Sequence, residues 1–224
     1  MRRPEGGVRA WSSAPGEGHL AFSGEPGGLW RRLGRAPNRL IGVGFTAQGF
    51  DMARPYQLMP GAADPRAAFA FDGVTEATIG DHGLFGAAAG IEIDRFDAGL
   101  GSPPHALVLA RADGFSGNWR RLTEEFLTLH PMIDGAASDL VRADLVFFET
   151  PAGGAVYATG SIAWTASLCS DGYANDVARV TGNVLRRFLD PAPFVMPAPD
   201  QVPRDDPDAG TPDAADVVEG YRRR

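Results

Sequence analysis

Two carboxylates that stand two residues apart are the strongest candidates for chemistry in this sequence. Glu92 and Asp94 occur in the stretch GIEIDRFD, where apolar and acidic residues alternate. Because successive side chains of a β-strand point to opposite faces, both carboxylates are predicted to share one face. Burial and a like-charged neighbour raise the pKa of a carboxyl group, as a general acid or base requires. The alternative is an edge strand whose acids are solvated or paired with Arg95 or Arg111.

The remaining reactive residue types give weaker signals. The four histidines lie far apart and lack the spacing and carboxylate context of zinc motifs; they are His19, His82, His105 and His130. His19 lies in the loop-rich opening stretch, where it could have a structural role or could contact a ligand. The single cysteine, Cys169, excludes an internal disulfide and a cysteine-based zinc cage. We therefore expect no metal site built wholly within this chain.

Bulk properties narrow the class of protein. The 224 residues suffice for one large domain with a real core, and a net charge of −7 argues against binding to nucleic acid through phosphates. No stretch approaches the 18 apolar residues of a membrane span, and the opening MRRPEGGVRAW lacks the apolar run of a signal peptide. The sequence thus predicts a cytoplasmic protein without membrane or nucleic-acid partners.

The elements that position these residues can be read from periodicity. Strands are predicted at 39–50, 67–74, 91–94 and 105–113, and an amphipathic helix is predicted at 118–131. Two further strands are expected at 140–149 and 155–159, around the turn TPAGG. A helix over 175–190 should be capped by Asn175 or Asp176 and buried along one stripe, namely Val177, Val180, Val184, Leu185 and Phe188. This order indicates an α/β fold with a mixed sheet and flanking helices.

Several long strings resemble a known family. They are GGLWRRLGRAPNRLIGVGFTAQGFD, DPRAAFAFDG, AAAGIEIDRFDAGLGSPPHALVLA and VRADLVFFETPAGGAVYATGSIAWTASL, followed by VLRRF. Together they resemble the C-terminal part of the large (beta) subunit of N,N-dimethylformamidase. The resemblance extends over about residues 5–190, so we expect one domain portion at 1–190. The Pro- and Asp-rich residues 191–224 are expected to form a flexible tail.

The resemblance implies both a fold and an activity. It implies the C-terminal portion of a class I glutamine-amidotransferase-like α/β domain, with a strand-rich insertion. It also implies hydrolysis of a small N-substituted amide to an acid and an amine by a large subunit. That subunit would assemble with a small subunit and with further copies of itself. In this family iron, held by two tyrosines and a glutamate, would activate water.

The metal-ligand segments of the family do not occur in this sequence. The family's His-Pro-Glu-Tyr and Gly-Gly-Asn-Gly-Phe segments have no counterpart, and the four tyrosines match no ligand position. We therefore expect a C-terminal fragment whose iron ligands lie upstream, and no iron bound by this chain alone. The resemblance places the family's second catalytic glutamate on Glu92, with Asp94 beside it as an orienting partner. His19, Glu25 and Trp30 are weaker candidates for lining the same cleft.

The sequence is also compatible with two other functions. The chain could be a non-catalytic scaffold or assembly module that keeps the fold and its contacts with partner chains. It could also belong to a related enzyme with another substrate, because a shared fold does not determine which amide is cleaved.

Overall fold

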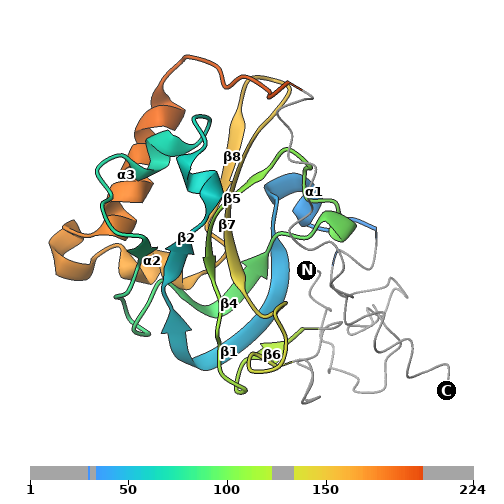
Figure 1. Cartoon of the computed structure of the whole chain (residues 1–224), viewed down its shortest axis with the longest axis vertical. Coiled ribbons are helices and arrows are strands. Elements are labelled where there is room, and N and C mark those ends of the chain that lie inside the picture. Colours follow the sequence, from blue (N-terminus) through green and yellow to red (C-terminus); the bar gives the residue numbers. More distant parts are fainter. Residues whose placement is uncertain (1–29, 31–33, 123–133, 199–224) are drawn as a thin grey trace, which may run out of the picture.

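The computed structural model describes Trp30, residues 34–122 and residues 134–198 (Figure 1). The strands are β1 (Gly44–Arg54), β2 (Tyr56–Leu58), β3 (Thr78–Ile79), β4 (Ala89–Arg95), β5 (Leu107–Ala112), β6 (Arg120–Arg121), β7 (Ala143–Glu149) and β8 (Ala155–Ala158). The α-helices are α1 (Asn38–Ile41), α2 (Ala163–Ser167) and α3 (Asp176–Leu189). Short 3₁₀ helices lie at Pro60–Ala63, Ala68–Phe71, Ala98–Leu100 and Ser170–Tyr173.

The strands form two antiparallel sheets. One has the order β4-β1-β6, and the other has the order β3-β2-β5-β7-β8. The α/β composition is as predicted, but every pairing in the described part of the chain is antiparallel, whereas the sequence predicted a mixed sheet. The short turn between β7 and β8 shows the reason, because parallel neighbours need a long crossover connection.

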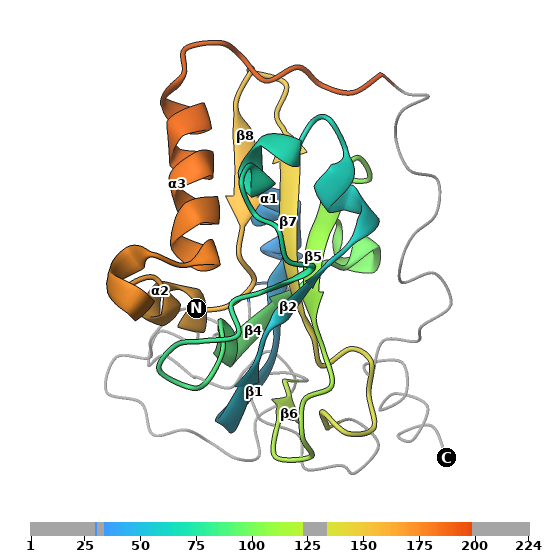
Figure 2. The same cartoon turned by 60° about the vertical axis from the view of Figure 1, so that its left-hand side comes forward.

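One continuous ribbon connects the two sheets. The long strand β1 ends at Arg54, and β2 begins at Tyr56, so that only Pro55 separates strands of different sheets (Figure 2). Proline supplies no backbone N–H to a sheet, which suits it to this corner. The predicted strand at 39–50 is therefore shifted: α1 occupies its start, and the strand runs on past residue 50.

Strand β7 is the centre of the hydrophobic core, and all of its residues are buried. Leu145 and Phe147 belong to the large apolar cluster that includes residues of α3, whereas Val146 and Phe148 belong to a second cluster with Val43. Alternate side chains thus fill both faces of the sheet, which explains the continuous apolar run in ADLVFFE. The predicted strands at 105–113, 140–149 and 155–159 are confirmed.

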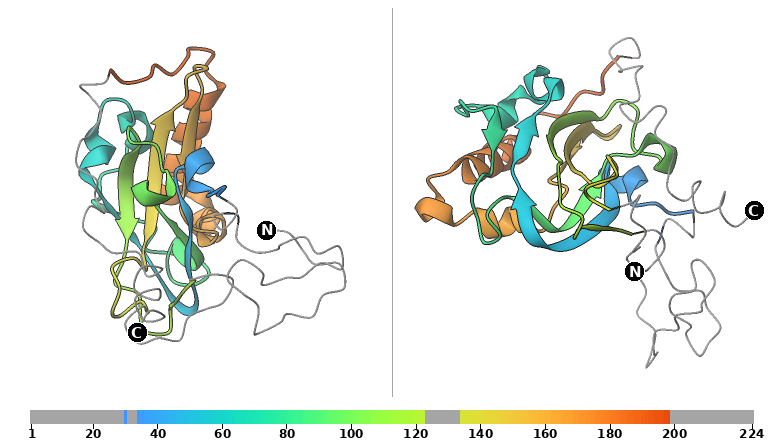
Figure 3. Two further views of the ribbon diagram at one scale, coloured as in Figure 1. Left: turned by 90° about the vertical axis from the view of Figure 1, so that its right-hand side faces the viewer. Right: turned by 60° about the horizontal axis from the view of Figure 1, so that its bottom comes forward.

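Helix α3 covers one side of the sheets together with α2, and α1 lies on the other side (Figures 1 and 3). The predicted cap is Asn175, whose side-chain oxygen accepts a hydrogen bond from the Ala178 N–H at 2.8 Å. Val177, Val180 and Val184 are buried as predicted. None of the helices in the described ranges is long and apolar enough to cross a membrane.

Three sequence predictions require correction. Leu185 and Phe188 are exposed, because the buried stripe of α3 is narrower than predicted. Residues 67–74 contain a 3₁₀ helix instead of a strand; the N–H groups of Ala67 and Ala68 both bond to the carbonyl oxygen of Asp64, which starts a turn. The helix predicted at 118–131 is wrong at its start, where β6 pairs with β1; residues 123–133 lie outside the described residues.

The predicted tail begins within the described part of the chain. Residues 191–198 follow α3, and the Phe194 ring packs against the rings of Phe69, Phe147 and Phe188, with centroids 5.4–6.2 Å apart. The Arg187 guanidinium lies 3.8 Å from the centroid of the Phe194 ring. These contacts anchor the start of the predicted tail to the core, and residues 199–224 lie outside the described residues.

Candidate active site

Glu92 and Asp94 lie on the same face of β4, as the alternation predicted. In the antiparallel pairing of β4 with β1, Glu92 stands opposite Gln48 and Asp94 stands opposite Phe45. Ile93, between the two acids, is fully buried on the opposite face. Residues directly opposite in such a pair share a face, so the Gln48 amide neighbours the carboxylates.

Neither carboxylate is neutralised by the arginines that the sequence offered as partners. The Arg95 guanidinium instead donates to Thr46 Oγ1 at 2.6 Å and contacts the carboxylate of Asp97. Arg111 Nε donates to Asp144 Oδ1 at 2.7 Å. Glu92 and Asp94 form no ion pair with any residue that the structure describes. The salt-bridge alternative is therefore wrong within that part of the chain.

The pKa of Asp94 is raised from an ordinary 3.8 to about 6. Burial is the larger cause, and the negative charge of Glu92 is the second. The physical cause is the one predicted from the sequence, desolvation together with a like-charged neighbour, but it acts on Asp94. Asp94 can therefore hold a proton close to neutral pH.

The free edge of β4 is covered by the segment after β8. The Asp94 N–H donates to the Gly160 carbonyl at 2.8 Å, the Ile162 N–H donates to the Glu92 carbonyl at 3.4 Å, and Ser161 forms a bridge with Ile93. Gly160 has a φ of 68°, and a Cβ there would lie 2.3 Å from the Asp144 carbonyl oxygen. Only glycine permits this close approach. The acids therefore do not lie on an open strand edge.

Tyr56 of β2 is fully buried and lies close enough to Asp94 to be affected by its charge, and Tyr157 of β8 is partly buried. The Tyr56 hydroxyl donates to the Thr159 carbonyl at 2.6 Å, and burial together with the charge of Asp94 raises the pKa of Tyr56 well above its ordinary value. Burial also raises the pKa of Tyr157, whose hydroxyl has no hydrogen-bond partner among the described residues. Both phenols stay protonated at neutral pH, so they offer donors and not phenolate oxygens.

Of the other predicted site residues, Trp30 alone lies among the described residues. Trp30 has half of its surface exposed, and within the described ranges no hydrogen bond, ion pair or ring contact links it to Glu92 or Asp94. His19 and Glu25 lie outside the described residues. Their predicted part in lining the cleft stays a prediction.

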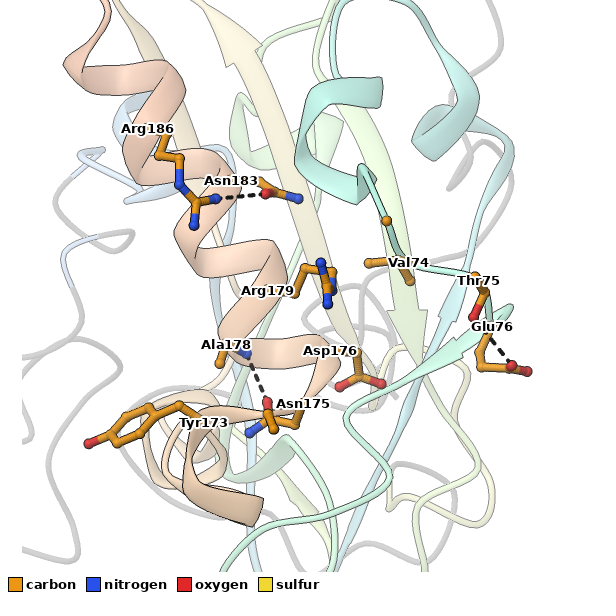
Figure 4. A pocket seen from close by; sticks show the side chains of 12 residues that line it. Val74, Thr75, Glu76, Tyr173, Asn175, Asp176, Ala178, Arg179, Asn183 and Arg186 are labelled. Carbon is orange, nitrogen blue, oxygen red and sulfur yellow. Dashed lines mark hydrogen bonds between the residues drawn. The ribbon is translucent and has the colours of Figure 1, made fainter.

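A pocket of about 470 Å³ lies away from the pair, between α3 and the loop after the 3₁₀ helix at Ala68–Phe71 (Figure 4). Two arginines of its lining, Arg179 and Arg186, are balanced by Glu76 and Asp176. Because its charges cancel and most of its side chains are exposed, the pocket shows no chemistry of its own. We take the carboxylate pair as the candidate site although the pocket lies elsewhere.

The sequence did not indicate that Ser161 and Tyr56 lie near the pair. No spacing connects Ser161, which follows the predicted strand at 155–159, with Asp94, which lies far earlier in the chain. The small residues of TGSIAW were the one signal of this contact, because small residues after a strand allow another backbone to approach closely.

The chain is similar in sequence to known proteins. A family model described as N,N-dimethylformamidase beta subunit-like, C-terminal, matches residues 1–177. The N,N-dimethylformamidase beta subunits of Paracoccus aminophilus and of an Alcaligenes species are each 40% identical to this chain over 197 residues. The match covers 86% of this chain and 26% of each relative, so the chain spans about a quarter of the length of these relatives.

Proposed function

Because the chain belongs to the N,N-dimethylformamidase beta subunit-like C-terminal family, we propose that it forms part of a hydrolase that cleaves a small N-substituted amide to an acid and an amine. The observation that carries the proposal is the pair formed by Glu92 and Asp94. Two carboxylates share one face of β4, no described cation neutralises them, and the pKa of Asp94 is raised to about 6.

The two acids have complementary roles in this proposal. The Glu92 carboxylate takes a proton from the water whose oxygen bonds to the amide carbon. Asp94 gives its proton to the nitrogen as the carbon–nitrogen bond breaks, so that a neutral amine leaves. Such a division requires an acid that holds its proton close to neutral pH, which the raised pKa of Asp94 provides. Proton exchange with water then restores the starting state.

The iron implied by the family does not fit the residues described here. Among them no group of three or more histidine, cysteine, aspartate or glutamate side chains could hold a metal ion. The pKa values of Tyr56 and Tyr157 are raised, so both phenols are protonated at neutral pH, and Tyr56 already donates to a carbonyl oxygen. We propose that iron in the longer protein is bound by residues outside this chain, and no step above passes through it.

The longer assembly is part of the same proposal. The relatives are named as beta subunits, which supports assembly of this chain's protein with another subunit. Assembly with further copies of itself is proposed from the family resemblance. We also propose that the two antiparallel sheets form the C-terminal portion of a class I glutamine-amidotransferase-like domain. A cytoplasmic location is proposed from the single cysteine, which leaves no pair for an internal disulfide.

A chimera tests the proposed activity. The matched segment of the Paracoccus aminophilus beta subunit is replaced by this chain, the chimera is produced with its companion subunit, and dimethylamine release from N,N-dimethylformamide is measured. We expect an active chimera, and loss of activity by roughly 10²-fold or more in Glu92→Gln. The matched control is Glu76→Gln, an exposed glutamate far from β4, which should retain full activity.

Two outcomes would count against the proposal. One is a chimera that folds and assembles but releases no dimethylamine. The other is full activity in the Glu92→Gln variant, which would favour the alternative of a non-catalytic assembly module. A panel of small amides with the active chimera then distinguishes dimethylformamide from other substrates.

A further inference from the structure

The backbone immediately before Glu92 is held in an unusual conformation. Ile91 has a φ of 68°, in the left-handed region that a β-branched residue rarely adopts. The pairing of β4 with β1 is irregular at the same place, because its register shifts between Gly49 and Arg54 of β1. Such conformations persist only where the surroundings hold them, and they gather at functional sites.

The hydroxyl of Ser161 holds the residue that precedes this strained position. Ser161 Oγ accepts hydrogen bonds from the Gly90 N–H at 2.8 Å and from the Ala163 N–H at 3.1 Å, and it donates to the Gly90 carbonyl at 3.0 Å. One donor and two acceptors are the full capacity of a hydroxyl group. Ser161 is 9% exposed, so water has little access to these bonds.

Contacts on both sides keep the strained residue in place. A Cβ on Gly90 would lie 2.7 Å from the Ala53 Cβ of β1, so Gly90 has no room to shift toward β1. Beyond Ile91, the Glu92 carbonyl accepts from the Ile162 N–H at 3.4 Å. The segment that carries Ser161 therefore holds β4 by hydrogen bonds before and after Ile91. Glu92 is the residue immediately after Ile91.

We propose that Ser161 is a positioning residue for Glu92: its hydroxyl clamps the Gly90 peptide, keeps Ile91 in the left-handed conformation and so fixes the Glu92 carboxylate beside Asp94. The assignment of a catalytic purpose to this clamp rests on the proposed amide hydrolysis. The clamp itself is a property of this chain and can be measured without any activity.

The test uses the full 224-residue chain with labelled carboxyl carbons, and NMR follows the titration of Asp94. Because the Glu92 charge acts on Asp94, displacement of Glu92 should lower the pKa of Asp94. We expect Ser161→Ala to lower it by about one unit. The matched control is Ser167→Ala, another buried serine whose hydroxyl bonds to two carbonyl oxygens, those of His82 and Ala163, without touching β4. It should leave the pKa of Asp94 unchanged.

A second substitution tests the route through Ile91. Glycine adopts a positive φ without strain, so Ile91→Gly reduces the need for the clamp. In a double-mutant cycle, adding Ile91→Gly to Ser161→Ala should restore at least half of the lost shift in the pKa of Asp94. The single variant Ile91→Gly, which retains Ser161, should keep a value close to that of the unmodified chain. This single variant also serves as the test if Ser161→Ala does not fold. A large fall in the pKa of Asp94 in Ile91→Gly would contradict the proposal.

The outcomes separate the clamp from the proposed function. Equal effects of Ser161→Ala and Ser167→Ala on the pKa of Asp94, or no rescue by Ile91→Gly, would overturn the proposal. In the chimera, Ser161→Ala should lower kcat with little change in KM, as expected when a reacting group is misplaced and substrate binding is intact. If Glu92→Gln leaves the chimera active while the NMR results hold, the proposed function fails and the clamp remains.

Discussion

Asp94 illustrates how position within one strand separates two acids of similar chemistry. Both carboxylates share a face of β4, yet the pKa increase to about 6 acts on Asp94, with burial as its main cause and Glu92 as the second. Sequence alternation could place the acids together, but it could not tell that Asp94 would have a raised pKa. The resemblance implied catalysis by Glu92, and in the proposed mechanism the raised pKa of Asp94 makes it the proton donor.

The raised pKa of Asp94 predicts a pH dependence of stability. The folded protein binds this proton more tightly than the unfolded chain, so the free energy of unfolding should fall as the pH rises from about 4 to about 6. Asp94→Asn removes this penalty and should raise the free energy of unfolding at pH 7 by roughly 2 kcal/mol, with no gain at pH 3.

Urea denaturation at pH 3, 5 and 7 measures this effect. The control is Asp72→Asn, which removes an exposed carboxylate in a loop. It should change the stability equally at each pH. A pH profile of Asp94→Asn parallel to that of the unmodified chain would contradict the raised pKa of Asp94.

At the scale of elements, the site depends on segments that are brought together from distant parts of the chain. Strand β4 pairs with β1 on one edge and with residues 160–162 on the other. The latter segment leads directly into α2, and the loop after α2 leads to the cap of α3. The orientation of these helices therefore affects the edge of the strand that carries Glu92.

The cap of α3 provides a test at this scale. Asn175 Oδ1 accepts from the Ala178 N–H, and its Nδ2 donates to the carbonyls of Leu168 and Ser170, at 3.0 and 2.6 Å. Asn175→Ala should reduce the free energy of unfolding by about 1 to 2 kcal/mol, because the helix loses its cap and the preceding turn loses two bonds.

Thermal unfolding followed by circular dichroism measures the loss. The control is Asn118→Ala, which removes an exposed asparagine whose Nδ2 donates to Asp51 at 3.2 Å on the protein surface. It should cost less than about 0.5 kcal/mol. Equal losses in the two variants would show that the cap has no special role.

At the scale of the whole molecule, one buried carboxylate joins the two sheets. Asp144 of β7 is fully buried; its Oδ1 accepts from Arg111, and its Oδ2 accepts from the Phe96 N–H and from Arg142 Nε, each at 3.0 Å. Phe96 directly follows β4, so Asp144 binds the end of the three-stranded sheet to β7, an interior strand of the five-stranded sheet. The position of β4 in the molecule depends on this link.

Removal of that link should affect the entire domain. Asp144→Ala takes the buried carboxylate from two arginines and a backbone N–H, and we expect a loss of about 3 to 5 kcal/mol in the free energy of unfolding. Urea denaturation of Asp144→Ala and of the control Asp113→Ala, which removes an exposed acid, gives the comparison. A loss under about 1 kcal/mol would contradict the proposed link between the sheets.

Local sequence patterns predicted much of the fold. The apolar run of β7, the alternation of β4 and the capped amphipathic pattern of α3 each reflect a periodicity over a few residues. Predictions failed where distant contacts decide the outcome. Arg120 and Arg121 form a strand because they pair with β1. Residues 67–74 contain a 3₁₀ helix because the Asp64 carbonyl accepts hydrogen bonds from two N–H groups and starts a turn.

The sequence by itself determined the family, the positions along the chain of the strands β4, β5, β7 and β8, and the common face of Glu92 and Asp94. Only the tertiary structure decided that Arg95 and Arg111 bind other acids, that Asp94 carries the raised pKa and that Ser161 clamps the backbone before Glu92. The reason is physical. Strand alternation is set by neighbouring residues, whereas burial, charge and hydrogen-bond partners depend on segments far apart in the chain.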